Sequence, residues 1–367
     1  MSRLERALLA LVLLFTALAG VGRYASGFPT VLAFVLAALA LAGQAWTVSF
    51  ATEQIGMRFG PAATGVLQST IGNLPEFFVV LFALQAHEKT VAETALIGSI
   101  LVNALLVLGA VLVTGAARER RGVMRFATGL PNDTATLMLV ASLTIVLIAL
   151  VTGSHDGAGH HVQAISIVGA AALLIVYAVW MRQYLRGDRA PGADAGAGAG
   201  GDAGGHVGGD AEKPRVSLRT AVVLLIAAGV GSAFVSDWFV HALEPTIHRV
   251  HLSQSFAGIV IVAIAGNAVE NTAGIYLAYR GKHDLAISVV KNSVAQIAAF
   301  LYPLMVLVSL ATATHLTFAL APVWVGALIG TAILIWQITG DGEATPFEGA
   351  ALISVYVVLA TVAAFEH

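Results

Sequence analysis

Ser69-Thr70-Ile71-Gly72-Asn73-Leu74-Pro75-Glu76 is a polar stretch inside an apolar run, and it ends in a carboxylate. Downstream, Gly266-Asn267-Ala268-Val269-Glu270 repeats the G-N-x-x-E pattern at an offset of 194 residues (266 − 72 for the glycines). Ser99 and Ser293 keep the same offset, so the register continues beyond the motif. The two motifs predict two related halves whose function centres on a pair of matched helices.

The composition is typical of a membrane protein. Of 367 residues, 58% are hydrophobic and 11% are charged, whereas about 25% of a soluble protein is charged. Apolar stretches of about 20 residues, enough to cross a bilayer as a helix, recur from end to end. The sequence has no cysteine, which excludes disulfides and thiolate metal sites. We therefore predict an all-α polytopic membrane protein. The net charge of -2 is near zero and gives no information about a nucleic-acid partner.

About eleven transmembrane helices are expected between polar or Gly/Pro boundaries. The first follows Arg3 and Arg6 and ends in Ala17-Leu18-Ala19-Gly20, so a cleaved signal peptide is its alternative interpretation. The approximate segments are 7–22, 28–50, 62–86, 91–115, 133–152, 160–181, 218–240, 254–279, 284–310, 315–338 and 346–365.

The placement of Lys and Arg predicts a cytoplasmic N-terminus and an external C-terminus, because inner loops and their flanks hold most of these cations. The outer loops hold only Arg23, Lys89 and Arg249. The two motifs lie in the third and eighth segments, five crossings apart, so they cross the membrane in opposite directions. Such inverted-topology repeats are typical of secondary transporters, whose substrate site lies at the repeat interface.

The predicted organisation is one extra N-terminal transmembrane helix (1–26), two inverted five-helix repeats (27–187 and 215–367) and a flexible cytoplasmic linker (188–214). The linker is almost all Gly, Ala and Asp, a composition that cannot form a packed core. Because its acids outnumber its bases, a weak cation-attracting tether is the alternative to a plain linker.

Glu76 and Glu270 are the first functional candidates. An ionised carboxylate in hydrocarbon is costly, so acids within membrane segments usually mark ion or proton pathways. Protons and cations compete for the same carboxylate oxygens. Two such groups at the repeat interface would hold two protons or one divalent cation, which is the logic of an antiporter. The alternative is a structural pair neutralised by hydrogen bonds within the bundle.

Neighbouring polar residues complete a candidate cation site. Asparagine amide oxygens suit a hard cation such as Ca²⁺. Glycine loosens each helix and frees backbone carbonyls, and Pro75 removes a further amide. Ser69 shares a helix face with Asn73 and Glu76. Interhelical hydrogen bonding is the alternative role. The predicted metal ligands are Glu76, Glu270, Asn73, Asn267, Gly72, Gly266, Ser99, Asn103, Ser293 and Gln296.

Other ionisable residues lie near the predicted segment ends. Glu53 is either a gate or a solvated interfacial acid. Lys291 is expected to snorkel to the cytoplasmic surface, the alternative being that its charge biases the site. An outer loop contains His155, His160 and His161, which are expected to be solvated rather than metal-binding. The next outer connection holds residues that could line an exit pathway: Asp237, His241, Glu244, His248 and His251.

These residues also resemble the cation/proton exchangers of the sodium/calcium exchanger superfamily, over nearly the whole chain. The resemblance implies eleven helices, alternating access and Ca²⁺ export driven by inward proton movement, with Glu76 and Glu270 as shared cation and proton ligands. The first α-repeat is matched by Thr52-Glu53 before Gly60-Pro61, by Gly72-Asn73-Leu74-Pro75-Glu76 and by Gly98-Ser99-Ile100-Leu101-Val102-Asn103, and the second by Gly266-Asn267-Ala268-Val269-Glu270 and Asn292-Ser293-Val294-Ala295-Gln296.

Three features depart from the family pattern. Gln68-Ser69-Thr70 stands where Asn-Ala and then Thr or Ser are common, and Lys291-Asn292 stands where small or apolar residues are usual. Both bear on the choice of ion. The linker is Gly-rich where many relatives carry a denser acidic helix thought to be regulatory, which bears on Ca²⁺ regulation.

The sequence therefore predicts a Ca²⁺/H⁺ antiporter of the inner or plasma membrane, not an enzyme. Its expected partners are the lipid bilayer and the transported Ca²⁺ and H⁺, with no cofactor and no nucleic acid. A Na⁺ or K⁺/H⁺ antiporter is the first alternative, because a cationic Lys291 disfavours a divalent ion. An intramembrane acid/base enzyme is another, although no H-E-x-x-H or G-x-S-x-G motif accompanies the glutamates. A cation sensor is the last, and the sequence shows no soluble output domain for it.

Overall fold

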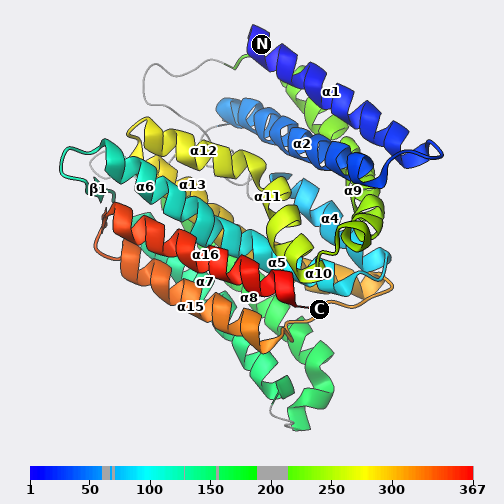
Figure 1. Cartoon of the computed structure of the whole chain (residues 1–367). Coiled ribbons are helices and arrows are strands. Elements are labelled where there is room, and N and C mark those ends of the chain that lie inside the picture. The colour runs from blue at the N-terminus through cyan, green and yellow to red at the C-terminus, as the bar shows by residue number, and fades with distance from the viewer. Residues whose placement is uncertain (60–66, 68–70, 128, 154–156, 188–213, 367) are drawn as a thin grey trace.

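A computed structural model describes residues 1–59, 67, 71–127, 129–153, 157–187 and 214–366, and these are predominantly helical (Figure 1). Short 3-10 turns occur at η2 (Gly157–His161) and η6 (Ser309–Ala311), and three π-helical turns at η1 (Val102–Val107), η4 (Ala257–Val262) and η5 (Ile297–Leu301). The α-helices are α1 (Arg3–Tyr24), α2 (Thr30–Phe59), α4 (Leu74–Gln85), α5 (Lys89–Leu101), α6 (Leu108–Arg118), α7 (Gly129–Gly153), α8 (Val162–Gly187), α9 (Leu218–Val250), α10 (Gln254–Phe256), α11 (Ala263–Gly266), α12 (Ala268–Tyr279), α13 (His283–Gln296), α14 (Tyr302–Val308), α15 (Pro322–Thr339) and α16 (Pro346–Phe365).

Nine helical stretches among the described residues are long and apolar enough to cross a membrane. A tenth consists of Gln254–Gly266 and Ala268–Tyr279, which meet at an angle of 63°. The predicted all-α polytopic membrane fold is therefore confirmed. The expected segment 62–86 is described only in part, chiefly as the 12-residue helix α4. Most of the predicted linker, 188–213, lies outside the described residues.

Two helices extend well past their predicted ends. α2 continues to Phe59 rather than residue 50, and α9 continues to Val250 rather than residue 240. In α9 the buried side chains of Ala242, Leu243 and Thr246 continue an apolar stripe at helical spacing, although Pro245 lies inside the helix. Charged residues on the exposed face hid this stripe from the sequence analysis.

The internal repeat is visible in the helix bounds. α4 and α12 both have 12 residues, and they begin 194 residues apart (268 − 74). α5 and α13 also begin 194 residues apart (283 − 89), and each runs into a π-helical turn, η1 and η5 respectively. The sequence repeat is therefore a structural repeat over these two pairs of helices.

The longer helices lie in layers on either side of α12. Figure 1 shows α1 and α2 on one side and α6, α16 and α15 on the other, with α12 between α2 and α6. Helices α5 and η4, which belong to different halves, pack backbone to backbone. A methyl group added at Gly98 would lie only 2.5 Å from Ile259 Cα, so no side chain separates them there. Small residues permit such close approach in membrane proteins. This crossing fixes α5 beside the bent pair formed by Gln254–Gly266 and Ala268–Tyr279.

A sheet of two short strands, not predicted from the sequence, closes one end of the bundle. β1 (Met124–Arg125) pairs antiparallel with β2 (Glu343–Ala344), and Arg125 Nε lies 3.0 Å from Glu343 Oε1. The sheet connects the end of α6 to the start of α16, and its residues are distant in sequence from both G-N-x-x-E motifs.

Candidate functional site

Both motif glutamates lie in the first turn of a helix that begins directly after an interruption of the helical backbone. Asn73 precedes α4 and Asn267 precedes α12, and neither side chain caps its helix. Pro75 lies near the start of α4, where its missing amide hydrogen costs little. The free amides and positive dipole end of a helix N-terminus favour a negative charge, so Glu76 and Glu270 occupy favourable positions for carboxylates.

Glu76 is buried, and one of its oxygens is held by donors from both halves of the chain. Oε1 accepts a hydrogen bond from Ser99 Oγ of α5 at 3.0 Å and another from the Asn267 amide at the start of α12. Oε2 is also buried but has no hydrogen-bond partner among the described residues. One carboxylate oxygen is therefore fixed while the other remains available.

Asn103 extends this network towards α13. It is fully buried on the π-helical turn η1, and its Nδ2 donates to Asn267 Oδ1 at 2.7 Å and to Ser293 Oγ at 3.2 Å. Its own oxygen, Oδ1, is buried without a hydrogen-bond partner in the described part of the chain. The structure thus joins five predicted site residues in one network: Glu76, Ser99, Asn103, Asn267 and Ser293.

Gly266 allows the second motif to pack against the first glutamate. A methyl group added at Gly266 would lie 2.9 Å from Glu76 Cγ and 3.3 Å from Glu76 Oε1. The role predicted for this glycine was to free carbonyl groups, and the structure adds a steric role. Any side chain here would displace the carboxylate.

Four of the remaining predicted ligands take no part in the hydrogen bonds described above. Asn73 is buried, and its Nδ2 has no hydrogen-bond partner among the described residues. Glu270 and Gln296 are half-buried, each three residues after a member of the network, and Gly72 lies in the turn before α4. Ser69 lies outside the described residues. No group of three or more His, Asp or Glu side chains that could hold a metal occurs in the described ranges.

Comparison with known proteins identifies the family. The family described as "Sodium/calcium exchanger protein" matches residues 29–182 and 220–365. The chain belongs to this family. It is 30% identical over 340 residues to a Ca²⁺/H⁺ antiporter of Synechocystis sp., covering 91% of each chain. It is 28% identical over 334 residues to the Ca²⁺/H⁺ antiporter ChaA of Bacillus subtilis, covering 91% of this chain and 92% of that one.

Solved structures show that the fold is shared with other exchangers. The structure of native YfkE superposes with a TM-score of 0.77 at 23% identity, covering 98% of both chains. The H⁺/Ca²⁺ exchanger CAX gives a TM-score of 0.70 at 16% identity, covering 98% of this chain and 92% of that one. The resemblance inferred from the two motifs is therefore confirmed for family and fold.

In this member of the exchanger family, Lys291 does not snorkel as predicted. It is 5% exposed on α13, and its Nζ donates a hydrogen bond to Thr339 Oγ1 of α15. The aliphatic part lies among side chains of η1, α6, α7 and α15, including Met138 and Ile335. The snorkelling prediction was wrong because these helices cover the face of α13 from which the side chain projects.

The other ionisable candidates do not join the network described above. Glu53 is half-buried on α2, and His160 and His161 are exposed on η2, which agrees with a solvated loop. His155 lies outside the described residues. Of the five predicted exit residues, His251 directly follows α9. The other four lie on α9 and not in a connection between helices: Asp237, His241, Glu244 and His248.

One residue that contacts the first motif was not predicted from the sequence. Ser236, fully buried on α9, donates a hydrogen bond to the carbonyl oxygen of Pro75 at 3.4 Å. Its signal was a small polar residue on the face of α9 that packs inward. Ser236 lies within the predicted segment 218–240, but recognising its face requires the packing of α9 against α4, which the sequence does not show.

Proposed function

We propose that this protein exchanges Ca²⁺ for H⁺ across the cell membrane by alternating access, with Ca²⁺ and protons competing for Glu76 and Glu270. The observation that carries the proposal is the buried Glu76 carboxylate, whose Oε1 is held from both halves and whose Oε2 is unpartnered among the described residues. A buried carboxylate must be neutralised by a proton or a cation. Either occupant fits the free oxygen, but not both together.

The chemistry of the surrounding groups supports a hard cation. Carboxylate, amide and hydroxyl oxygens are the ligands that Ca²⁺ takes, and the network offers these three kinds. The similar proteins of Synechocystis sp. and Bacillus subtilis are named as Ca²⁺/H⁺ antiporters. Together these observations favour Ca²⁺ over Na⁺ or K⁺ as the exchanged cation.

Cation binding would require the Asn267 amide to turn. In the structure its Nδ2 faces Glu76 and its Oδ1 accepts from Asn103. A cation bound by Glu76 would repel the amide hydrogens and attract the amide oxygen. Turning the amide breaks the bond between Asn267 and Asn103, which links occupancy of the site to contacts between the two halves.

The placement of Lys and Arg supports a cytoplasmic N-terminus and an external C-terminus. On this topology the repeats 27–187 and 215–367 are inverted, residues 1–26 form the extra helix, and residues 188–214 are a cytoplasmic linker. Alternating access then consists of movement of one repeat against the other around Glu76 and Glu270.

The test uses purified protein in liposomes that contain a pH-sensitive dye. With a proton gradient imposed, Ca²⁺, Na⁺ or K⁺ is added outside and the internal pH is followed. We expect Ca²⁺ to drive proton movement in the wild type and in the control Glu343→Gln, whose exposed acid lies on β2. We expect none in Glu76→Gln or Glu270→Gln.

Appreciable exchange in either site variant would contradict the two-carboxylate mechanism. A response to Na⁺ or K⁺ without Ca²⁺ would replace the proposed substrate by a monovalent cation. No response to any of the three ions, in protein shown to be folded, would contradict cation/proton exchange itself.

A further inference from the structure

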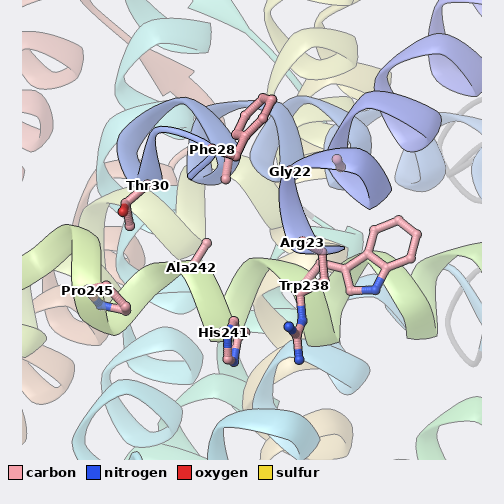
Figure 2. A pocket seen from close by; sticks show the side chains of 10 residues that line it. Gly22, Arg23, Phe28, Thr30, Trp238, His241, Ala242 and Pro245 are labelled. Atoms are coloured by element: carbon pink, nitrogen blue, oxygen red, sulfur yellow. The ribbon is translucent and has the colours of Figure 1, made fainter. Parts of the chain in front are cut away.

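The end of α1, the start of α2 and the middle of α9 enclose a pocket away from the motif residues (Figure 2). Its volume is about 180 Å³, several times the roughly 30 Å³ that one water molecule occupies in the liquid. Its polar side chains are Arg23 of α1, Thr30 of α2, and Trp238 and His241 of α9. The rest of the lining is apolar, so the polar groups define what the pocket would bind.

Two hydrogen-bond donors in this pocket lack an acceptor. Arg23 Nε and Trp238 Nε1 are both buried, and neither has a hydrogen-bond partner in the described part of the chain. Buried polar groups in proteins are nearly always hydrogen-bonded. Two unpartnered donors that line one pocket therefore indicate an acceptor supplied from outside the chain.

The charges around the pocket favour an anion. The Arg23 guanidinium is permanently charged, and no Asp or Glu is among the described residues that line the pocket. Asp237, next to Trp238 in sequence, instead lines a separate apolar cavity with Phe78 and Phe82. Thr30 begins α2, so the first-turn amides and positive dipole end of a 30-residue helix also border the pocket.

The aromatic side chains place the pocket at a membrane surface. Tyr24, the last residue of α1, is exposed and meets Trp238 edge to face, with ring centroids 6.2 Å apart. Tyr and Trp are enriched where spanning helices reach the lipid headgroups. Phosphate groups are the anions found at this depth, and the planar guanidinium of arginine binds them with paired hydrogen bonds.

We propose that this pocket binds a phosphate-type oxyanion, supplied either as inorganic phosphate or as the phosphodiester of an anionic phospholipid. The anion accepts hydrogen bonds from Arg23 and Trp238, with His241 and the start of α2 contributing further donors. It thereby connects α1 to α9, which joins the N-terminal helix to the second half of the chain.

The test uses full-length protein purified in detergent and stripped of lipid. One arm titrates inorganic phosphate against chloride at matched ionic strength and measures the thermal transition. The other adds phosphatidylglycerol or phosphatidylcholine and measures retained lipid by native mass spectrometry. The variants are Arg23→Gln and Trp238→Phe, with Arg249→Gln as the control because Arg249 is exposed on the same helix and does not line the pocket.

We expect saturable binding of phosphate, phosphatidylglycerol or both, weakened at least tenfold by Arg23→Gln and several-fold by Trp238→Phe, and unchanged by Arg249→Gln. The arm that responds identifies the source of the anion. Equal binding in the wild type and in folded Arg23→Gln would overturn the proposal, as would the absence of saturable binding in both arms. Because the readout is binding and not ion flux, the result is independent of the proposed exchange activity.

Discussion

Replacing Gly266 by alanine tests whether close packing of the second motif positions the first glutamate. The added methyl group would lie 2.9 Å from Glu76 Cγ. Carbon atoms in contact normally lie about 3.5–4.0 Å apart, so Glu76 must withdraw by roughly 0.6–1.1 Å. That movement lengthens the bonds to Ser99 and Asn267 and shifts both carboxylate oxygens.

The size of the effect follows from the overpacking. Inserting a methyl group into a well-packed interior costs about 1–3 kcal/mol. Since about 1.4 kcal/mol is a tenfold change in an equilibrium constant, the apparent affinity for the cation should fall roughly tenfold or more. Improved helix propensity of alanine offsets part of any loss in stability, so the variant is expected to fold.

The assay is Ca²⁺-dependent proton movement in liposomes across a range of Ca²⁺ concentrations, with thermal melting of the same preparations. Gly330→Ala on α15 is the control, because a methyl group there meets no atom within 4 Å. We expect a raised half-saturating Ca²⁺ concentration in Gly266→Ala alone. Wild-type affinity and rate in Gly266→Ala would refute the steric argument.

Three further predictions follow from individual contacts. Ser99→Ala, which removes a donor to Glu76, should weaken apparent cation affinity roughly tenfold, and more than Ser293→Ala, whose hydroxyl contacts Asn103 instead; equal effects in flux assays would contradict the hydrogen-bond assignment. Thr339→Val should lower the melting temperature more than Lys291→Met, because it leaves a buried ammonium without that acceptor whereas Met removes the charge at similar volume; the reverse order would show that the charge itself stabilises the fold. Glu88, in the turn before α5, has a pKa raised by burial and by Glu244, and lowered by His248. The stabilising contribution of Glu88 is therefore complete below its unfolded-state pKa of about 4.5 and is lost as the pH rises through its folded-state pKa. Glu244→Gln should reduce this loss of stability, and melting temperatures that change with pH as in the wild type would contradict the assignment.

The fold was largely predictable because bilayer-spanning helices need long apolar runs, and these are visible in the sequence. The ends of α2 and α9 were not, since both helices continue through residues such as Gln54 and His241 whose polarity resembles a loop. Only the burial of neighbouring residues, such as Leu243 on α9, shows that the helix continues.

The network was predictable in its membership and not in its pairing. The 194-residue offset identified Asn267 as a candidate. It did not predict that the amide of Asn267 contacts Glu76 of the other motif. The position of Lys291 was missed for a related reason, since its burial depends on α15, which the helical period of α13 alone does not reveal. Contacts between segments distant in sequence depend on how the helices pack.

The most direct test of the central claim measures Ca²⁺ binding and proton release together. Purified protein is titrated with Ca²⁺ by calorimetry at several pH values, in buffers that differ in ionisation enthalpy, which gives the number of protons released per ion bound. If Glu76 and Glu270 hold either protons or Ca²⁺, binding should release protons, the affinity should weaken as the pH falls, and both effects should disappear in Glu76→Gln. Ca²⁺ binding with the same affinity at every pH and without proton release would contradict competition at a shared site.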